Sequence, residues 1–284
     1  MLPFWVSIAL LSLFQGALVA VPGSIRVGAL GPLRGRRWAL IPPLSIIAFV
    51  FGARAAQHAS AQGLTYLALV AVPALAVLAV GWLVRGARPR WTLLVGVLFA
   101  LAWADGGQLP GEAAALLLSG LSCVALGVLL AALTPPRWLS AGIIAMALAD
   151  TALVASDLLQ RPNNALNAAR PVAGLPQLQS AVFGSAVMGY GDIFIAATLG
   201  GLLALRFGRA AQRRAAVLTA ALALASDLLF FAINELPATV PVALALVAVL
   251  LRRRRQGRGA EPARPAQRQQ LRAAARSPGA PLAP

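Results

Sequence analysis

The stretch MGYGDIFIAA, residues 188–197, places the carboxyl group of Asp192 behind two glycines, at the head of an apolar run that continues to about residue 205. An ionisable side chain inside a membrane span costs about 2.5–3.5 kcal/mol on insertion scales, so its default interpretation is functional. Gly189 and Gly191 let another backbone approach closely, because glycine has no Cβ. An acid presented beside accessible backbone is suited to chemistry on a peptide.

The composition of the whole chain is that of a membrane protein. Of its 284 residues, 60% are hydrophobic and 11% are charged, with a mean hydropathy of +0.80. Soluble domains carry about 25% charged residues. We therefore expect an all-α polytopic membrane protein. The single cysteine, Cys123, excludes an internal disulfide, and a single histidine, His58, argues against a zinc site. We expect no cofactor and no metal.

Nine apolar runs are candidate transmembrane helices, several of them near the roughly 20 residues that cross a bilayer. The second and fourth runs are short, and Pro42-Pro43 interrupts the second. We expect the first run to remain as an uncleaved span, because no basic residue precedes it as in a signal peptide. The runs cover residues 2–21, 38–51, 64–84, 91–104, 113–133, 138–159, 181–205, 215–233 and 237–251.

Positive charge predicts the orientation of these spans. All 24 basic residues are arginines, and with nine spans 21 of them fall in segments on the same side as the C-terminus. Only Arg54, Arg161 and Arg170 fall on the other side. The positive-inside rule then places the N-terminus outside and the C-terminus in the cytoplasm. This topological pattern explains the net charge of +16 without nucleic acid as a partner.

The chain divides into a transmembrane domain, residues 1–251, and a tail, residues 252–284. The tail is rich in Arg, Ala, Pro and Gln and poor in large apolar residues, so we expect it to be disordered and cytoplasmic. Exclusive use of arginine is typical of a GC-rich genome. We therefore expect an integral protein of a bacterial plasma membrane, in contact with its lipid.

Depth in the membrane indicates which acids can meet. Asp150 lies 13 residues beyond Arg137 and Asp192 lies 14 residues before Arg206. With a rise of about 1.5 Å per residue, both are about 20 Å from the cytoplasmic side. Asp157 lies two helical turns beyond Asp150 on the same face of the helix, near the outer interface. The segment 237–239 falls at the same level as Asp150 and Asp192, and a proline there interrupts the helix.

Asp227 is equally deep, 13 residues beyond Arg214, so depth does not choose between it and Asp150 as the partner of Asp192. Asp227 is alternatively a packing residue, hydrogen-bonded to a serine or threonine of a neighbouring span. Asp105 and Glu112 lie in a short outer loop, where we interpret them as solvated acids. The segment 161–180, rich in Pro, Asn and Gln, is expected to be an exposed connection.

These residues resemble the presenilin and signal peptide peptidase family of GxGD intramembrane aspartyl proteases. The resemblance covers a catalytic half, residues 138–251, with an Asp in span six, GxGD in span seven and a Pro-Ala-Leu-type motif opening span nine. It implies that Asp150 and Asp192 are the catalytic pair. It also implies a supporting set of residues that shape the active site: Gly189, Tyr190, Gly191, Pro237, Ala238 and Thr239. The chain departs from the family at Ala149, where Tyr is usual, and at Thr239, where Leu is usual.

The resemblance implies hydrolysis of peptide bonds within transmembrane segments or signal-peptide remnants. Two close carboxyl groups in a low-dielectric site share a proton, so one acts as base on a water while the other protonates the scissile carbonyl. A helical substrate must first unwind, because its carbonyls are occupied by intrahelical bonds. With the N-terminus outside, the orientation is similar to that of signal peptide peptidase, and we expect substrates of type II orientation.

Three alternatives remain open. Prepilin peptidases share GxGD but usually carry Lys two residues later, where Phe194 stands, and Asp157 with Pro162-Asn163 is similar to their first motif. A small proton-coupled transporter also uses buried carboxylates. An inactive scaffold that binds membrane partners would keep the same fold.

Overall fold

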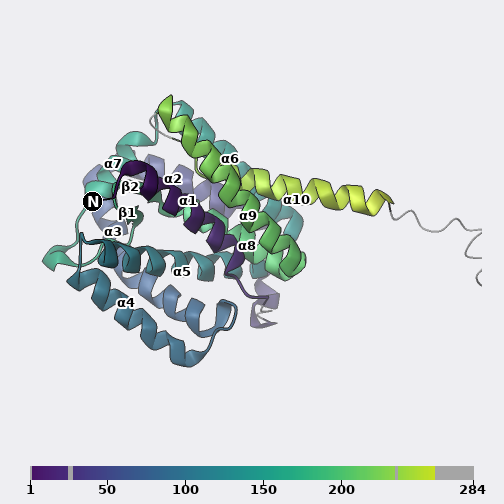
Figure 1. The fold of residues 1–284 in the computed structure, drawn as a ribbon, viewed down its shortest axis with the longest axis horizontal. Coiled ribbons are helices and arrows are strands. Elements are labelled where there is room, and N and C mark those ends of the chain that lie inside the picture. The colour runs from purple at the N-terminus through teal and green to yellow at the C-terminus, as the bar shows by residue number, and fades with distance from the viewer. Residues whose placement is uncertain (1, 25–27, 234–235, 260–284) are drawn as a thin grey trace, which may run out of the picture. The chain divides into compact units, whose positions relative to one another are not determined.

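The computed structural model describes residues 2–24, 28–233 and 236–259 (Figure 1), and these are predominantly α-helical. The helices are α1 (Phe4–Ala20), α2 (Ile41–Ala55), α3 (Gln57–Leu78), α4 (Leu93–Ala104), α5 (Leu109–Leu133), α6 (Pro136–Ala155), α7 (Gln160–Ala168), α8 (Tyr190–Arg206), α9 (Gly208–Asp227) and α10 (Val240–Gly259). The strands β1 (Ser180–Phe183) and β2 (Ala186–Gly189) form one antiparallel hairpin. A π-helical turn, Ala79–Leu83, extends α3.

Each of the nine apolar runs contains a helix. Five helical segments in the described residues are long and apolar enough to cross a membrane: Arg36–Ala55, Ala59–Leu83, Leu109–Leu133, Pro136–Ala155 and Gly208–Phe231. Two shorter apolar helical segments are Phe4–Ala20 and Pro89–Ala104. The chain is thus a helical membrane protein, as its composition predicts.

Pro42 and Pro43 begin a helix instead of interrupting one. Both lie in the first turn of α2, which follows a short 3-10 segment, Arg36–Leu40. The first turn of a helix has backbone N–H groups without intrahelical partners, so proline, which lacks this donor, is tolerated there. The predicted interruption of the second run is therefore wrong.

The seventh apolar run, residues 181–205, is not one helix. Its first part forms the β1–β2 hairpin, closed by a two-residue turn in which Gly184 has a positive φ of 61°. Helix α8 begins only at Tyr190. Periodicity does not distinguish a strand from a helix in a short apolar run. Here the Gly184-Ser185 turn favours a hairpin over a continuous helix.

The segment expected as an exposed connection contains structure of its own. Helix α7 starts soon after α6 and contacts α3 and α2. Its Pro162 is buried, and its asparagines lie on a wall of the cavity described below. The strong amphipathicity of this short helix, which has a polar and an apolar face, explains why it packs despite its polar composition.

The tail also begins later than expected. Helix α10 continues through residues 252–259, because arginine is a good helix former and adding a turn to an existing helix is favourable. Residues 260–284 lie outside the described residues. By internal contacts the chain divides into a unit 1–246 and a unit 247–284.

Helix α8 is the centre of the first unit. All twelve residues from Ile193 to Ala204 are buried, so the helix is apolar on every face, as a central helix must be. It packs most extensively on α5. Gly127 of α5 brings the two backbones together, since a Cβ at this position would lie 2.7 Å from backbone atoms of Ala197 and Thr198. Small residues allow such close packing in a bilayer.

Candidate functional site

A cavity of about 980 Å³ lies among α1, α2, α3, α5, α6, α7, α8, α9 and the segment that precedes α10. Its walls are mostly apolar, with leucines from α3 and α5 along much of its length. Asp150, Asp192 and Asp227 all line it. The three carboxyl groups predicted at one depth therefore open onto the same space.

Asp150 lies inside α6 and is only 3% exposed. The hydroxyl of Thr239 donates a hydrogen bond of 2.6 Å to its Oδ2 atom. Thr239 is itself fully buried and immediately precedes α10. The residue that departs from the family motif is thus bound directly to one of the two predicted catalytic acids.

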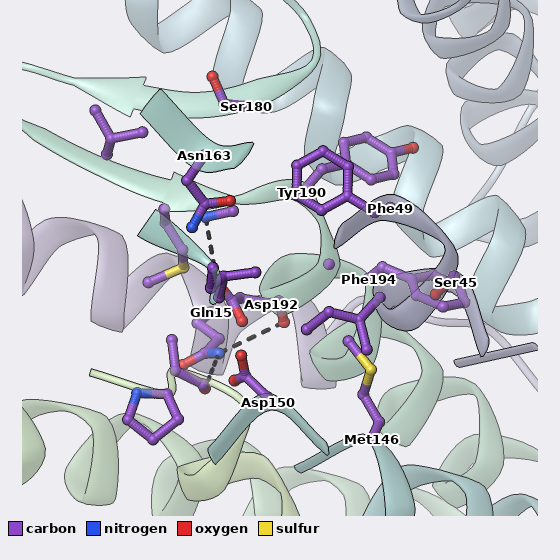
Figure 2. Close-up of a pocket in the computed structure, with 18 of the residues that line it drawn as sticks. Gln15, Ser45, Phe49, Met146, Asp150, Asn163, Ser180, Tyr190, Asp192 and Phe194 are labelled. Carbon is purple, nitrogen blue, oxygen red and sulfur yellow. Dashed lines mark hydrogen bonds between the residues drawn. The ribbon is translucent and has the colours of Figure 1, made fainter. Parts of the chain in front are cut away.

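Asp192 is the third residue of α8, and its side chain turns back to the start of the helix. Its Oδ2 atom accepts the backbone N–H of Gly189 at 3.2 Å. A carboxylate at this position interacts favourably with the positive end of the helix dipole. Figure 2 shows the carboxyl groups of Asp150 and Asp192 directed toward each other, close enough for an electrostatic interaction between them.

The GxGD residues have separate roles. The hydroxyl of Tyr190 shares a hydrogen bond of 2.7 Å with Ser122 of α5, which fixes the start of α8 against that helix. Gly189 is exposed and lies on the cavity wall. A Cβ at Gly189 would come within 3.0 Å of the carboxylate of Asp192, whereas at Gly191 it would make an ordinary contact with Met146. Gly189 is therefore the more restrictive of the two glycines.

The β1–β2 hairpin leads directly into Asp192. Ser180 pairs with Gly189, and Val187, Met188 and Gly189 of β2 line the cavity. Within the described residues β2 pairs only with β1, so its other edge has no strand partner, and of its end residue the N–H of Gly189 is bonded to Asp192. Val187 is 46% exposed on this strand.

The turn of the hairpin is held from two sides. Glu112, at the start of α5, accepts the backbone N–H of Gly184 at 2.7 Å. Ser7 of α1 accepts the backbone N–H of Ser185 at 3.2 Å. Glu112 is therefore a structural acid and not the solvated loop acid expected from its position.

The Pro237-Ala238 segment also lines the cavity. The carbonyl oxygen of Ala238 accepts a hydrogen bond of 2.7 Å from the side-chain amide of Gln15 in α1. The same amide lies 3.5 Å from the backbone oxygen of Asp192, a longer and weaker contact. Figure 2 shows Gln15 beside both aspartates, with these two hydrogen bonds drawn as dashed lines.

The two remaining acids are placed differently. Asp227, 9% exposed, accepts a hydrogen bond of 2.8 Å from Ser12 of α1, in agreement with the packing interpretation. Asp157 is exposed, follows the end of α6 and does not line the cavity. The structure therefore brings Asp150, Asp192 and the 237–239 segment together and leaves Asp157 apart.

Sequence reasoning missed the polar residues of α1 and α7. Gln15 and Ser12 are isolated polar side chains within an apolar span, which is itself a signal, since such groups need partners in lipid. Asn163, Asn164 and Asn167 of α7 also line the cavity. The amphipathic spacing of residues 160–168 would have predicted a helix with one polar face. The prediction of an exposed connection considered only the polar composition of this segment.

Within the described residues no group of three His, Cys, Asp or Glu side chains is arranged to hold a metal ion. The available chemistry is that of two facing carboxyl groups in a mostly apolar cavity. Such groups do not both ionise readily and can exchange a proton through a bound water. Comparison with protein-family models, curated proteins and solved structures returns no match.

Proposed function

We propose that this protein is an intramembrane aspartyl protease, similar to the presenilin and signal peptide peptidase family, with Asp150 and Asp192 as its catalytic pair. One observation carries the proposal. Two carboxyl groups from different helices face each other in a cavity, and each has its own hydrogen-bond donor, Thr239 for one and Gly189 for the other. Pairs of acids held in this way are suited to general acid–base catalysis.

The pair would hydrolyse a peptide bond in two steps. One carboxylate takes a proton from a water molecule, whose oxygen attacks the scissile carbonyl carbon, while the other carboxyl group gives its proton to the carbonyl oxygen. The resulting diol then collapses. The C–N bond breaks as the departing nitrogen takes the proton that the first carboxylate had received, and one hydroxyl of the diol returns its proton to the second carboxylate as it becomes the new carbonyl. The pair ends with one proton, as it began.

The substrate would bind as an extended strand beside the pair. A transmembrane helix must unwind before its peptide bonds can be attacked, because its carbonyls accept intrahelical bonds. The outer edge of β2, whose last residue, Gly189, directly precedes Tyr190-Gly191-Asp192, offers backbone groups to an unwound segment. The apolar walls of the cavity suit the side chains of a membrane-spanning peptide.

The proposal includes the topology of nine spans, with the N-terminus outside and the C-terminus in the cytoplasm of a bacterial plasma membrane. It rests on the nine helical runs and on the distribution of arginine. Substrates would be transmembrane segments or signal-peptide remnants of type II orientation. Efficient cleavage of only the opposite orientation would contradict this part.

A second candidate is a proton-coupled transporter. The observation that favours it is the presence of a third carboxyl group, Asp227, on the wall of the same cavity. A proton relay tolerates an Asp→Glu change more readily, whereas a catalytic pair must be held within about 0.5 Å of its working geometry. The prepilin-type alternative has less support, since Asp157 is exposed and does not line the cavity.

The test is cleavage of a labelled type II transmembrane peptide by purified protein in lipid. Asp150→Asn and Asp192→Asn should each lower the rate by about 10²- to 10⁴-fold. Asp157→Asn and Asp227→Asn serve as matched controls and should retain most activity, since an asparagine oxygen can still accept the hydrogen bond of Ser12. Loss of activity with Asp227→Asn but not with Asp150→Asn would reject the proposed pair. Proton flux without cleavage would favour the transporter.

A further inference from the structure

Helix α1 contributes three polar side chains, and each is directed to a different part of the site. Ser7 holds the turn of the β1–β2 hairpin, Ser12 binds Asp227, and Gln15 contacts the segment before α10 and the start of α8. Ser7 and Gln15 are fully buried, and Ser12 is 2% exposed. The first span, which lies outside the half of the chain that carries the motifs, is therefore part of the site.

The orientation of the Gln15 amide follows from its partners. Both partners, the backbone oxygens of Ala238 and Asp192, are acceptors, so the nitrogen of the amide must face them. Ala238 directly precedes Thr239, whose hydroxyl is bonded to Asp150. A continuous path of polar contacts thus connects the backbone of Asp192, through Gln15 and the 238–239 peptide, to the carboxylate of Asp150.

We infer that Gln15 is a positioning residue for the Asp150–Asp192 pair. Gln15 lies in α1, and not in the helix of either aspartate or in the segment that carries Thr239. Its amide therefore connects three elements: α1, the start of α8 and the segment before α10. Its amide limits how far the 237–239 segment can move from the start of α8. The inference rests on the proposed function, because it concerns the geometry of the same catalytic pair.

Gln212 of α9 provides a matched control. It is also fully buried, and its amide nitrogen likewise donates to backbone oxygens, those of Val19 and Pro22 at 3.0 Å and, more weakly, that of Gly200 at 3.4 Å. Its amide oxygen accepts a further hydrogen bond of 2.8 Å from Arg85. Gln212 does not line the cavity of the aspartates. Gln212→Leu removes at least as many amide hydrogen bonds as Gln15→Leu, so it should affect stability without affecting the geometry at the aspartates.

The experiment compares Gln15→Leu, Gln15→Glu and Gln212→Leu with wild type, by cleavage of one labelled transmembrane peptide in lipid at several pH values. Thermal unfolding of each variant measures the folded fraction. Gln15→Leu should lower kcat by about 10- to 100-fold, with KM changed by less than about threefold, because small misplacement of catalytic groups costs rate. Gln212→Leu should keep kcat per folded molecule within about twofold.

Gln15→Glu supplies a readout that a packing role would not produce. The introduced carboxyl group donates to the oxygen of Ala238 only when it is protonated, and repels that oxygen when it is ionised. Its activity relative to wild type should therefore rise as the pH is lowered. A constant ratio across pH, or full kcat in Gln15→Leu, would overturn the inference while leaving the protease intact. Absence of cleavage by wild type would instead reject the proposed function, and this inference with it.

Discussion

The hydroxyl of Thr239 donates a 2.6 Å hydrogen bond to Oδ2 of Asp150, across 89 positions of sequence. Both side chains are buried, so neither can exchange this bond for one with bulk water. Leucine, usual at the position of Thr239 in the resembled family, could not make this bond. The departure from the motif thus adds a polar contact to the proposed catalytic pair.

Thr239→Val should lower kcat/KM by about 10- to 100-fold. Valine has nearly the shape of threonine but no donor, and a hydrogen bond to an ionisable group contributes about 1.5–3 kcal/mol. Thr239→Ser keeps the hydroxyl and should retain activity near wild type. Peptide cleavage kinetics in lipid provide the measurement.

The control for this comparison is Thr219→Val in α9. Thr219 is fully buried as well, but its hydroxyl has no hydrogen-bond partner within the described residues. The same change of side chain there should leave activity unaltered. Equal activity of Thr239→Val and Thr219→Val would show that the bond to Asp150 does not contribute to catalysis.

Glu112→Ala should loosen the β1–β2 hairpin. Its carboxylate accepts the backbone N–H of Gly184 at 2.7 Å, and no other side chain in the described residues bonds to that group. Loss of a hydrogen bond to a carboxylate, about 1.5–3 kcal/mol, should speed amide hydrogen exchange in the 180–189 segment by about 10- to 100-fold. Hydrogen exchange with mass spectrometry measures it.

Two further variants serve as controls for this prediction. Glu112→Gln keeps an oxygen acceptor and should show a smaller effect than Glu112→Ala. Asp105→Ala changes the acid of the loop between α4 and α5, whose side chain makes no hydrogen bond within the described residues, and should leave the hairpin unchanged. Similar exchange rates in Glu112→Ala and wild type would show that the turn is held by other contacts.

The constant rise of a helix predicts from the sequence that Asp150 can meet Asp192, but it places Asp227 at the same depth, and only the family resemblance implies the pairing with Asp150. Asp150 and Asp192 approach from opposite directions along the chain, and counting from the nearest cytoplasmic arginine brings them to one level. The same count brings the 237–239 segment there. Depth is a property of each helix alone, so it needs no knowledge of how the helices pack.

Contacts that depend on packing could not be predicted in this way. Gln15 donates to Ala238 across 223 positions, and only the arrangement of α1 beside α8 and α9 brings them together. The hairpin was missed because residues 181–188 are as apolar as a helix in lipid. Glu112 was misread because its partner, the Gly184 amide, exists only once that hairpin forms.

Gly127→Ala should destabilise the packing of α5 on α8. A Cβ at this position would lie 2.7 Å from backbone atoms of Ala197 and Thr198, which cannot turn away as a side chain can. Overpacking of this kind costs about 1–3 kcal/mol and should lower the unfolding temperature. Because α8 carries Asp192, peptide cleavage should fall as well.

Gly96→Ala in α4 is the matched control, because a Cβ there would meet nothing within 4 Å. Alanine is about 1 kcal/mol better than glycine in a helix, so this variant should be as stable as wild type or more so. Unfolding temperatures of the two variants in the same lipid give the comparison. If Gly127→Ala were as stable as Gly96→Ala, the close approach of α5 and α8 at Gly127 would not contribute to the stability of the fold.

The orientation of the chain can be tested with single cysteines. The only native cysteine, Cys123, is fully buried and should not react, so a Cys123→Ala background is needed only as a check. Arg88 and Val172 are exposed residues that precede α4 and follow α7, respectively. With nine spans and the N-terminus outside, Arg88→Cys should react with a membrane-impermeant reagent only from the cytoplasmic side, and Val172→Cys only from the outside.

The two positions together separate an inverted topology from a miscounted one. Exchange of both sides would mean that the arginine-rich segments face outward, against the positive-inside rule. Reaction of both from the same side would mean that the number of crossings between Arg88 and Val172 is even, not odd. Either result would also reverse or remove the preference for type II substrates, because that preference follows from the direction in which α6 and α8 cross the membrane.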